Sequence, residues 1–118
     1  MLGTAEWDKV EVTYTSPEDP GATLGDYTLV ATPTEVTYTL NGEKKTAKLA
    51  DGAWAALTTG VRAFGDRSAT ACKGKGSITI KASAAGTTKQ GFEANGCDAG
   101  DAFKQATDLV AQVIAQIK

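Results

Sequence analysis

The residues able to do chemistry are few in this sequence, and the two cysteines, Cys72 and Cys97, are the most informative of them. The chain contains no histidine. Hydrolases of the Ser-His-Asp and Cys-His types need an imidazole as their general base, so these mechanisms are excluded. A structural zinc site built from cysteine and histidine needs more ligands than two cysteines supply. We therefore predict no catalytic residue, no metal site and no cofactor.

Carboxylates are the remaining candidates for acid–base chemistry. Glu18 and Asp19 share a loop-like segment, and Asp98 and Asp101 flank the expected start of a helix. Two catalytic carboxylates must face one another across a cleft, with the pKa of one raised by burial. Helix capping explains the two aspartates more simply, because a carboxylate accepts hydrogen bonds from the free N–H groups of the first turn. An enzyme that uses carboxylates, or lysine and tyrosine, is the least favoured of three functional hypotheses.

The two cysteines instead predict a disulfide. A bond between Cys72 and Cys97 would close a loop of about 25 residues and stabilise the fold by roughly 3–3.5 kcal/mol through chain entropy. Disulfides persist in oxidising compartments. Together with the abundance of threonine and alanine, this pair favours an exported bacterial protein. We predict an extracytoplasmic location, either secreted or attached to the cell surface.

The N-terminal segment bears on the export route. Residues 1–6 lack the apolar run of a signal peptide, which fits either a cytoplasmic protein or a mature exported domain that begins at a new Met1. A signal peptide ending in a lipid-modifiable cysteine upstream of Met1 would identify a lipoprotein. No stretch of the sequence reaches the roughly 20 apolar residues of a membrane-spanning helix.

One aromatic residue is a candidate for recognition. Trp7 precedes the first expected strand and lies outside a clear periodic pattern, whereas Trp54 falls on the apolar stripe of a helix. Amphipathic aromatic side chains are enriched at binding surfaces. Trp7 is therefore our candidate ligand-binding residue, and core packing is the alternative for it.

Strand-like segments must position these residues. Polar and apolar residues alternate over residues 8–15, 26–32 and 77–82, and a return strand is expected over 87–93. The clearest hairpin joins residues 34–40 to 43–49 through Asn41-Gly42, a pair that tolerates the positive φ angles of a type I′ turn. A two-residue turn fixes the register of the hairpin. The expected pairs are Leu40 with Glu43, Tyr38 with Lys45, Val36 with Ala47, Glu35 with Lys48 and Thr37 with Thr46.

Two further segments have helical periodicity. Apolar residues recur every three or four positions over residues 54–64, which predicts a helix with Asp51 as its N-cap and Gly65 as its stop. The same spacing over residues 103–117 predicts a second helix, capped by Asp98.

The expected fold class is therefore α+β, an antiparallel sheet of five to six strands with two helices packed on one face. The length of 118 residues fits a single domain over residues 1–118. The other face of the sheet, rich in threonine, lysine and glutamate, would then meet water.

The charge distribution restricts the partners. The net charge is −2, and the densest basic groups are the short runs at residues 43–45 and 72–75. Sequence-independent binding of nucleic acid needs clustered lysine and arginine to displace counterions from phosphates. We therefore expect no nucleic-acid partner, and a protein or cell-surface partner stays open.

Three segments resemble part of a known family. Ala71-Cys72, the strand 77–81 and residues 91–97 (GFEANGC) are similar to the second half of the subtilisin-inhibitor-like family. In that family a cysteine precedes a strand pair and a second cysteine follows a return strand containing phenylalanine. The resemblance implies a secreted protease inhibitor. The family's other disulfide is missing here, and a long helix follows Cys97, so no inhibitory residue is assigned.

Three hypotheses of function follow. The favoured one is a non-catalytic binding or interaction domain, exported or surface-attached, since a stable scaffold with a polar outer sheet face lacks any recognisable catalytic constellation. The alternative is a secreted protease inhibitor that presents an exposed loop, such as residues 16–25 or 66–76. The carboxylate-based enzyme is third.

Overall fold

Six strands and two helices make up the fold. The computed structural model describes residues 7–16, 26–40, 42–50, 52–69, 76–97 and 101–115. The elements are β1 (Lys9–Thr15), β2 (Tyr27–Ala31), β3 (Glu35–Leu40), β4 (Glu43–Lys48), α1 (Ala53–Phe64), β5 (Ser77–Ala84), β6 (Thr87–Asn95) and α2 (Ala102–Ala115).

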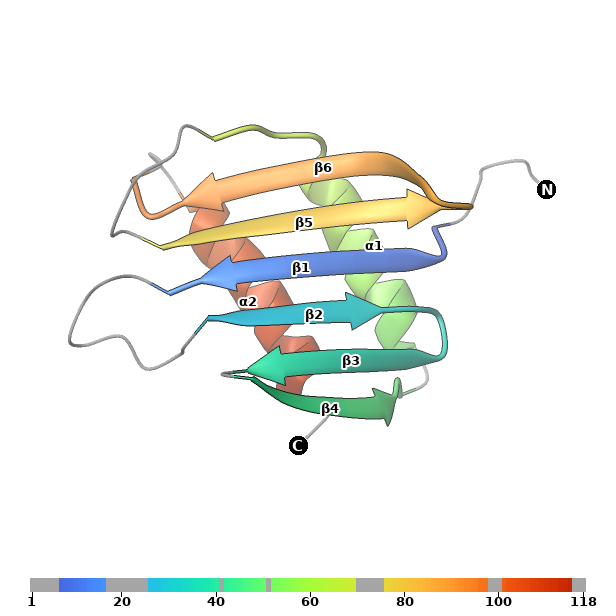
Figure 1. The fold of residues 1–118 in the computed structure, drawn as a ribbon. Helices are drawn as coiled ribbons and strands as arrows, with labels where there is room; N and C mark the ends of the chain where they lie inside the picture. The colour runs from blue at the N-terminus through green and yellow to red at the C-terminus, as the bar shows by residue number, and fades with distance from the viewer. Residues whose placement is uncertain are drawn as a thin grey trace.

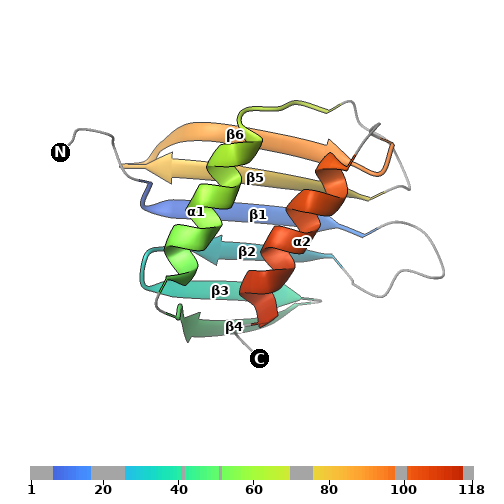
Figure 2. The same cartoon turned by 180° about the vertical axis from the view of Figure 1, so that it is seen from behind.

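One antiparallel sheet contains all six strands, in the spatial order β4-β3-β2-β1-β5-β6. Both helices cover the same face of this sheet. Figure 1 shows the uncovered face toward the viewer with the helices behind it, and Figure 2 shows α1 and α2 side by side in front of the strands. The predicted α+β class, the strand number and the one-sided helix layer are confirmed.

The β3–β4 hairpin has the predicted register. Leu40 lies opposite Glu43, and the pairing continues to Glu35 opposite Lys48. The hydroxyl groups of Thr37 and Thr46 are hydrogen-bonded across the strands, 3.1 Å apart. Gly42 has a φ of 85°, a value that glycine adopts without steric cost. The sequence rule that a two-residue turn fixes register is confirmed here.

The first strand in the chain lies in the middle of the sheet. β1 pairs with β2 on one side and with β5 on the other. After edge strand β4, α1 crosses the covered face and returns the chain to the far half of the sheet, where β5 and β6 complete it (Figure 2). Because of this crossover, β1 and β5 become neighbours although they are far apart in the sequence.

The core lies between the sheet and the two helices. Val10, Val12 and Tyr14 alternate along β1 as buried residues, while α1 contributes Leu57 and Val61 to the same cluster. Burying a side chain of this size stabilises the fold by about 1.5–3 kcal/mol. In β1 and α1 the apolar periodicity therefore marks the buried face, as the sequence pattern predicts.

The start of α1 differs from the prediction. Gly52, rather than Asp51, is the N-cap residue, and no side chain makes a capping hydrogen bond there. The φ of Gly52 is 82°, which glycine adopts more readily than aspartate. The predicted stop is confirmed, because Gly65 follows the last helical residue and its N–H donates to the Arg62 carbonyl. The predicted cap of the second helix, Asp98, lies outside the described residues.

A glutamine side chain links the end of α1 to the sheet by hydrogen bonds. The side-chain Nε2 of Gln90, in β6, donates to the backbone carbonyls of Val61 and Gly65 at 2.6 and 3.1 Å. Carbonyl groups in the last turn of a helix lack partners within the helix. The contact therefore satisfies two acceptors and fixes α1 against β6.

A short segment after α1 covers the outer edge of β6. The N–H of Arg67 donates to the Gly91 carbonyl, and the N–H of Glu93 donates to the Arg67 carbonyl, both at 2.9 Å. The side chain of Asp66 also accepts from the Gly91 N–H at 2.9 Å. This pairing is missing from the sequence prediction, which treats residues 66–75 as a plain polar connection.

The two helices approach closely at one glycine. A methyl group added at Gly60 of α1 would lie 2.7 Å from Cδ2 of Leu109 in α2.

Within the described part of the chain, neither helix is long and apolar enough to span a membrane.

Candidate functional site

The uncovered face of the sheet presents a row of threonines, here called the threonine row. Thr13 of β1 lies opposite Thr28 of β2 and opposite Thr79 of β5. Thr28 in turn lies opposite Thr39 of β3. The row thus crosses four adjacent strands in the order β3, β2, β1, β5. Thr13 and Thr28 are exposed, and the other two are half-buried.

Strand alternation explains why these hydroxyl groups face away from the helices. Successive side chains in a strand point to opposite faces. Val12 and Tyr14 are buried in the core, so Thr13 between them points outward. Because all four strands are aligned residue by residue, the threonine hydroxyls recur at the strand spacing of about 4.8 Å.

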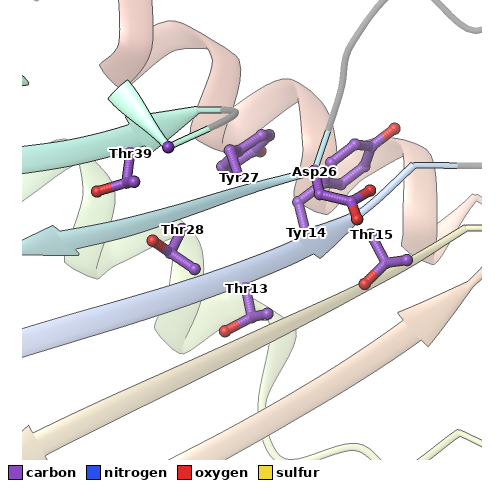
Figure 3. Close-up of a pocket in the computed structure, with 8 residues that line it drawn as sticks. Thr13, Tyr14, Thr15, Asp26, Tyr27, Thr28 and Thr39 are labelled. Carbon is purple, nitrogen blue, oxygen red and sulfur yellow. The ribbon is translucent and has the colours of Figure 1, made fainter. Parts of the chain in front are cut away.

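Two shallow hollows lie along the threonine row. The first has a volume of about 440 Å³ and lies over the ends of β1, β2 and β3. Figure 3 shows its polar lining, with Thr13, Thr28 and Thr39 on the strands and Asp26 at the start of β2. The complete lining is Thr13, Tyr14, Thr15, Asp26, Tyr27, Thr28, Thr39 and Gly42.

Asp26 provides a fixed carboxylate at the end of the first hollow. Its Oδ1 atom accepts hydrogen bonds from the backbone N–H of Ser16 at 2.7 Å and from the Ser16 hydroxyl at 2.9 Å. The backbone hydrogen bond, followed by that of the hydroxyl, lowers the pKa of Asp26 below its ordinary value. The carboxylate is therefore charged at neutral pH, and Ser16 fixes its orientation.

An aromatic stack supports this end of the sheet from the core side. The rings of Tyr14 and Tyr27 are stacked with centroids 4.8 Å apart, and Phe103 of α2 stacks on Tyr14 at 6.2 Å. Burial raises the pKa of Tyr14, and the nearby charge of Asp26 raises it further. Burial likewise raises the pKa of Tyr27. The tyrosines are thus neutral supports rather than acid–base groups at physiological pH.

The second hollow adjoins the first through Thr13. Its volume is about 400 Å³, and it lies over β1, β5 and β6. The lining is Glu11, Thr13, Thr79, Lys81 and Glu93. Lys9 and Glu11 form an exposed ion pair at 3.5 Å. Carboxylates and one lysine thus frame the threonines on this side.

The arrangement suits hydrogen bonding to a ligand. A threonine hydroxyl both donates and accepts, and a carboxylate accepts with two oxygen atoms. The hollows are open and lie side by side, so they fit an extended ligand better than an enclosed small molecule. Within the described ranges, no group of three or more His, Cys, Asp or Glu side chains is placed to hold a metal ion.

The predicted ligand-binding residue, Trp7, is buried. Its side chain is 7% exposed and belongs to the core cluster, and the guanidinium carbon of Arg62 lies 4.5 Å from its ring centroid. Packing and a cation–π contact therefore occupy most of the ring. A role for Trp7 in ligand binding stays a prediction.

The remaining predicted residues fall partly outside the described chain. Cys72 lies outside the described residues, so its bond with Cys97 stays a prediction. The two expected inhibitory loops are described only in part, since residues 17–25 and 70–75 are outside the described ranges. In the described part, residues 66–69 pair with β6 and are not presented as a free loop.

The sequence prediction missed the threonine row. The signal was present as threonines at outward positions of several strands, but it had no meaning without the strand order. Thr13 and Thr79 become neighbours only because β5 pairs with β1, a pairing that local patterns do not specify.

The comparisons with known proteins add no further assignment. No family model, no curated protein and no solved structure matches this chain.

Proposed function

We propose that the chain is a non-catalytic binding domain, exported or attached to the cell surface, and that the threonine row with its two hollows is its ligand surface. The observation that supports this most directly is the register that aligns hydroxyl groups on four adjacent strands. Both hollows lie along this row, so its hydroxyl groups are within reach of a ligand.

The chemistry of the surface favours a polyhydroxylated chain, such as a cell-surface polysaccharide. Sugar hydroxyls donate to carboxylates and exchange hydrogen bonds with threonine hydroxyls. Asp26 contributes a carboxylate to the first hollow and Glu93 contributes one to the second, and threonines line both. From Thr39 to Glu93 the surface crosses four strand spacings, or about 19 Å, which is long enough for several sugar units.

Co-sedimentation with insoluble polysaccharides tests this proposal. The probes are cellulose, chitin and purified peptidoglycan, and we expect the protein to be retained by at least one of them. Released reducing ends are measured in the same samples, and a binding domain releases none. Retention on none of the probes, or steady release of sugar, would contradict the proposal.

A pair of valine substitutions locates the binding surface. Thr13→Val together with Thr28→Val removes two hydroxyls and keeps the β-branched shape. With each hydrogen bond contributing about 0.5–1.5 kcal/mol, affinity for the retained polysaccharide is expected to fall by about ten-fold. Thr88→Val is the matched control, because Thr88 is an exposed strand residue that lines neither hollow. Equal affinity of the double variant and the control would show that the ligand binds elsewhere.

A further inference from the structure

The two edges of the sheet differ in their protection. At the β6 edge, the segment 66–69 forms hydrogen bonds with the outer backbone groups of Gly91 and Glu93. At the opposite edge of the sheet, β4 pairs with β3 on one side. No strand among the described residues pairs with its other side. Figure 1 shows β4 as the outermost strand on its side of the sheet. Among the residues that the structure describes, the β6 edge is therefore partly covered and the β4 edge is open.

The hairpin register determines which backbone groups of β4 are free. In an antiparallel hairpin with a two-residue turn, the residues that close the turn exchange hydrogen bonds, and every second pair does so thereafter. Leu40 and Glu43 close this turn, and at the far end the N–H of Leu49 donates to the Thr34 carbonyl at 3.0 Å. The pairs at both ends of the hairpin therefore belong to the same alternating set of hydrogen-bonded pairs. The backbone groups of Lys44, Thr46 and Lys48 consequently point away from β3.

Lysine side chains surround these free groups. Lys44, Lys45 and Lys48 are exposed, and the only described ion pairs are those of Lys9 with Glu11 and Lys104 with Asp108. Lys44 and Lys48 lie on the outer face with Thr46 between them, while Lys45 lies on the helix side opposite Tyr38. Glu43 and Glu35 lie nearby but form no ion pair with these lysines. The open edge therefore has three cations available to a ligand.

We propose that the β4 edge binds an extended acidic segment of a partner protein as a seventh strand of the sheet. Lysines on an edge also hinder pairing between identical copies, because like charges face one another. The same charges make the edge selective, since an added strand places its side chains directly opposite those of β4. A strand with acidic residues four positions apart and a small polar residue midway would match Lys44, Thr46 and Lys48.

A labelled peptide tests the proposal by fluorescence polarisation. The probe is Thr-Glu-Val-Thr-Val-Glu-Thr, and its counterpart has lysine at both glutamate positions. We expect saturable binding of the acidic peptide that weakens as salt is raised, and no binding of the basic one. Cross-strand ion pairs contribute about 0.2–1 kcal/mol each, so Lys44→Gln with Lys48→Gln should weaken binding by about five-fold. Equal binding of the two peptides would overturn the proposal.

Two variants at one position separate strand addition from simple charge attraction. Thr46→Pro removes the central outward N–H without breaking a hydrogen bond to β3, and proline is tolerated at such edge positions. Thr46→Val keeps the N–H and likewise loses the hydroxyl contact with Thr37. We expect Thr46→Pro to abolish binding and Thr46→Val to retain it. Circular dichroism and thermal unfolding confirm that both variants are folded, and equal affinity of the two would overturn the proposal.

Amide hydrogen exchange gives a second, independent readout on the unmodified protein. The peptide should slow exchange at Lys44, Thr46 and Lys48, whose N–H groups would enter new hydrogen bonds. Lys45 and Ala47, which already bond to β3, should change little. Unchanged exchange at the three edge residues would overturn the proposal. So would a dimer in analytical ultracentrifugation that competes with the peptide, because the edge would then belong to a second copy of the chain.

Discussion

At the scale of single residues, aromatic side chains bind the parts of this molecule together. Trp7 lies ahead of the sheet in the chain, yet it is buried against the core and covered by Arg62 of α1. At the opposite end, Tyr14 and Tyr27 stack beneath the first hollow. These rings connect the strands to the helix layer, so changes to them are expected to affect stability before they affect binding.

The Trp7–Arg62 contact gives a first prediction. Trp7→Ala should lower the free energy of unfolding by about 3–5 kcal/mol, the usual cost of truncating a buried aromatic side chain. Arg62→Met keeps an unbranched apolar stem and removes the cation, so the loss should be only about 0.5–1 kcal/mol. Urea unfolding measures both. A loss below about 1 kcal/mol for Trp7→Ala would indicate that the ring is exposed to solvent and free to contact a ligand.

Buried tyrosines give a second prediction, on the pH dependence of stability. Burial raises the pKa values of Tyr14, Tyr27 and Tyr38 in the folded protein above their ordinary value of 10.0. Above about pH 10 the unfolded chain loses these protons while the folded protein keeps them, so the stability falls as pH rises. Below that pH the contribution is fully present. Unfolding free energies measured in urea from pH 8 to pH 11 check this.

A phenylalanine variant is the control for that titration. Tyr27→Phe removes the hydroxyl group with the largest upward shift of pKa, so the fall in stability above pH 10 should become less steep than in the unmodified protein. An identical slope in the variant would mean that other groups, such as the lysines, cause the alkaline instability.

At the scale of elements, the sequence predicts the features that depend on residues close together in the chain. The β3–β4 register follows from Asn41-Gly42, and the end of α1 follows from Gly65, because turn and cap chemistry act over a few residues. The order of strands and the cover over the β6 edge depend on contacts between distant segments, for which the sequence has no comparable signal. The threonine row belongs to this second class, since it requires β5 beside β1.

The contact between the two helices gives a third prediction. Gly60→Ala should favour helix α1 by about 1 kcal/mol through backbone entropy, but its methyl group meets the Leu109 side chain at 2.7 Å. The methyl ends of Leu109 can rotate away at some cost in packing. We expect the gain from Gly60→Ala to be larger in a Leu109→Ala background than in the unmodified protein. A double-mutant cycle of thermal unfolding measures this coupling, and additive effects would show that the two sites do not interact.

At the scale of the whole molecule, the proposed location and the predicted disulfide depend on one another. An exported domain of this size gains from a covalent bond in an oxidising compartment. Cys97 lies between β6 and α2, so a bond to Cys72 would join the ends of the β5–β6 hairpin to each other. The covalent link would then reinforce the half of the sheet that contains the second hollow.

The disulfide gives a fourth prediction. Mass spectrometry of the native protein without reductant should show one bond and no alkylated thiol, and two free thiols would reject it. Replacement of Cys72, of Cys97 or of both by serine should lower stability by the same amount, about 3 kcal/mol. Unequal losses among the three variants would mean that the cysteines act separately and not as a pair.

The central position of β1 has a consequence for folding during synthesis. Lys9 pairs with Ser83, so during synthesis from the N-terminus β1 to β4 are complete long before β5 exists. A nascent four-stranded meander would therefore expose the β1 edge for a time, and unpaired edges invite aggregation. That transient edge presents the outward charges of Lys9 and Glu11, whereas the permanent edge presents the lysines of β4. Charged side chains thus protect two different edges of the sheet. They protect the β1 edge during folding and the β4 edge in the folded protein.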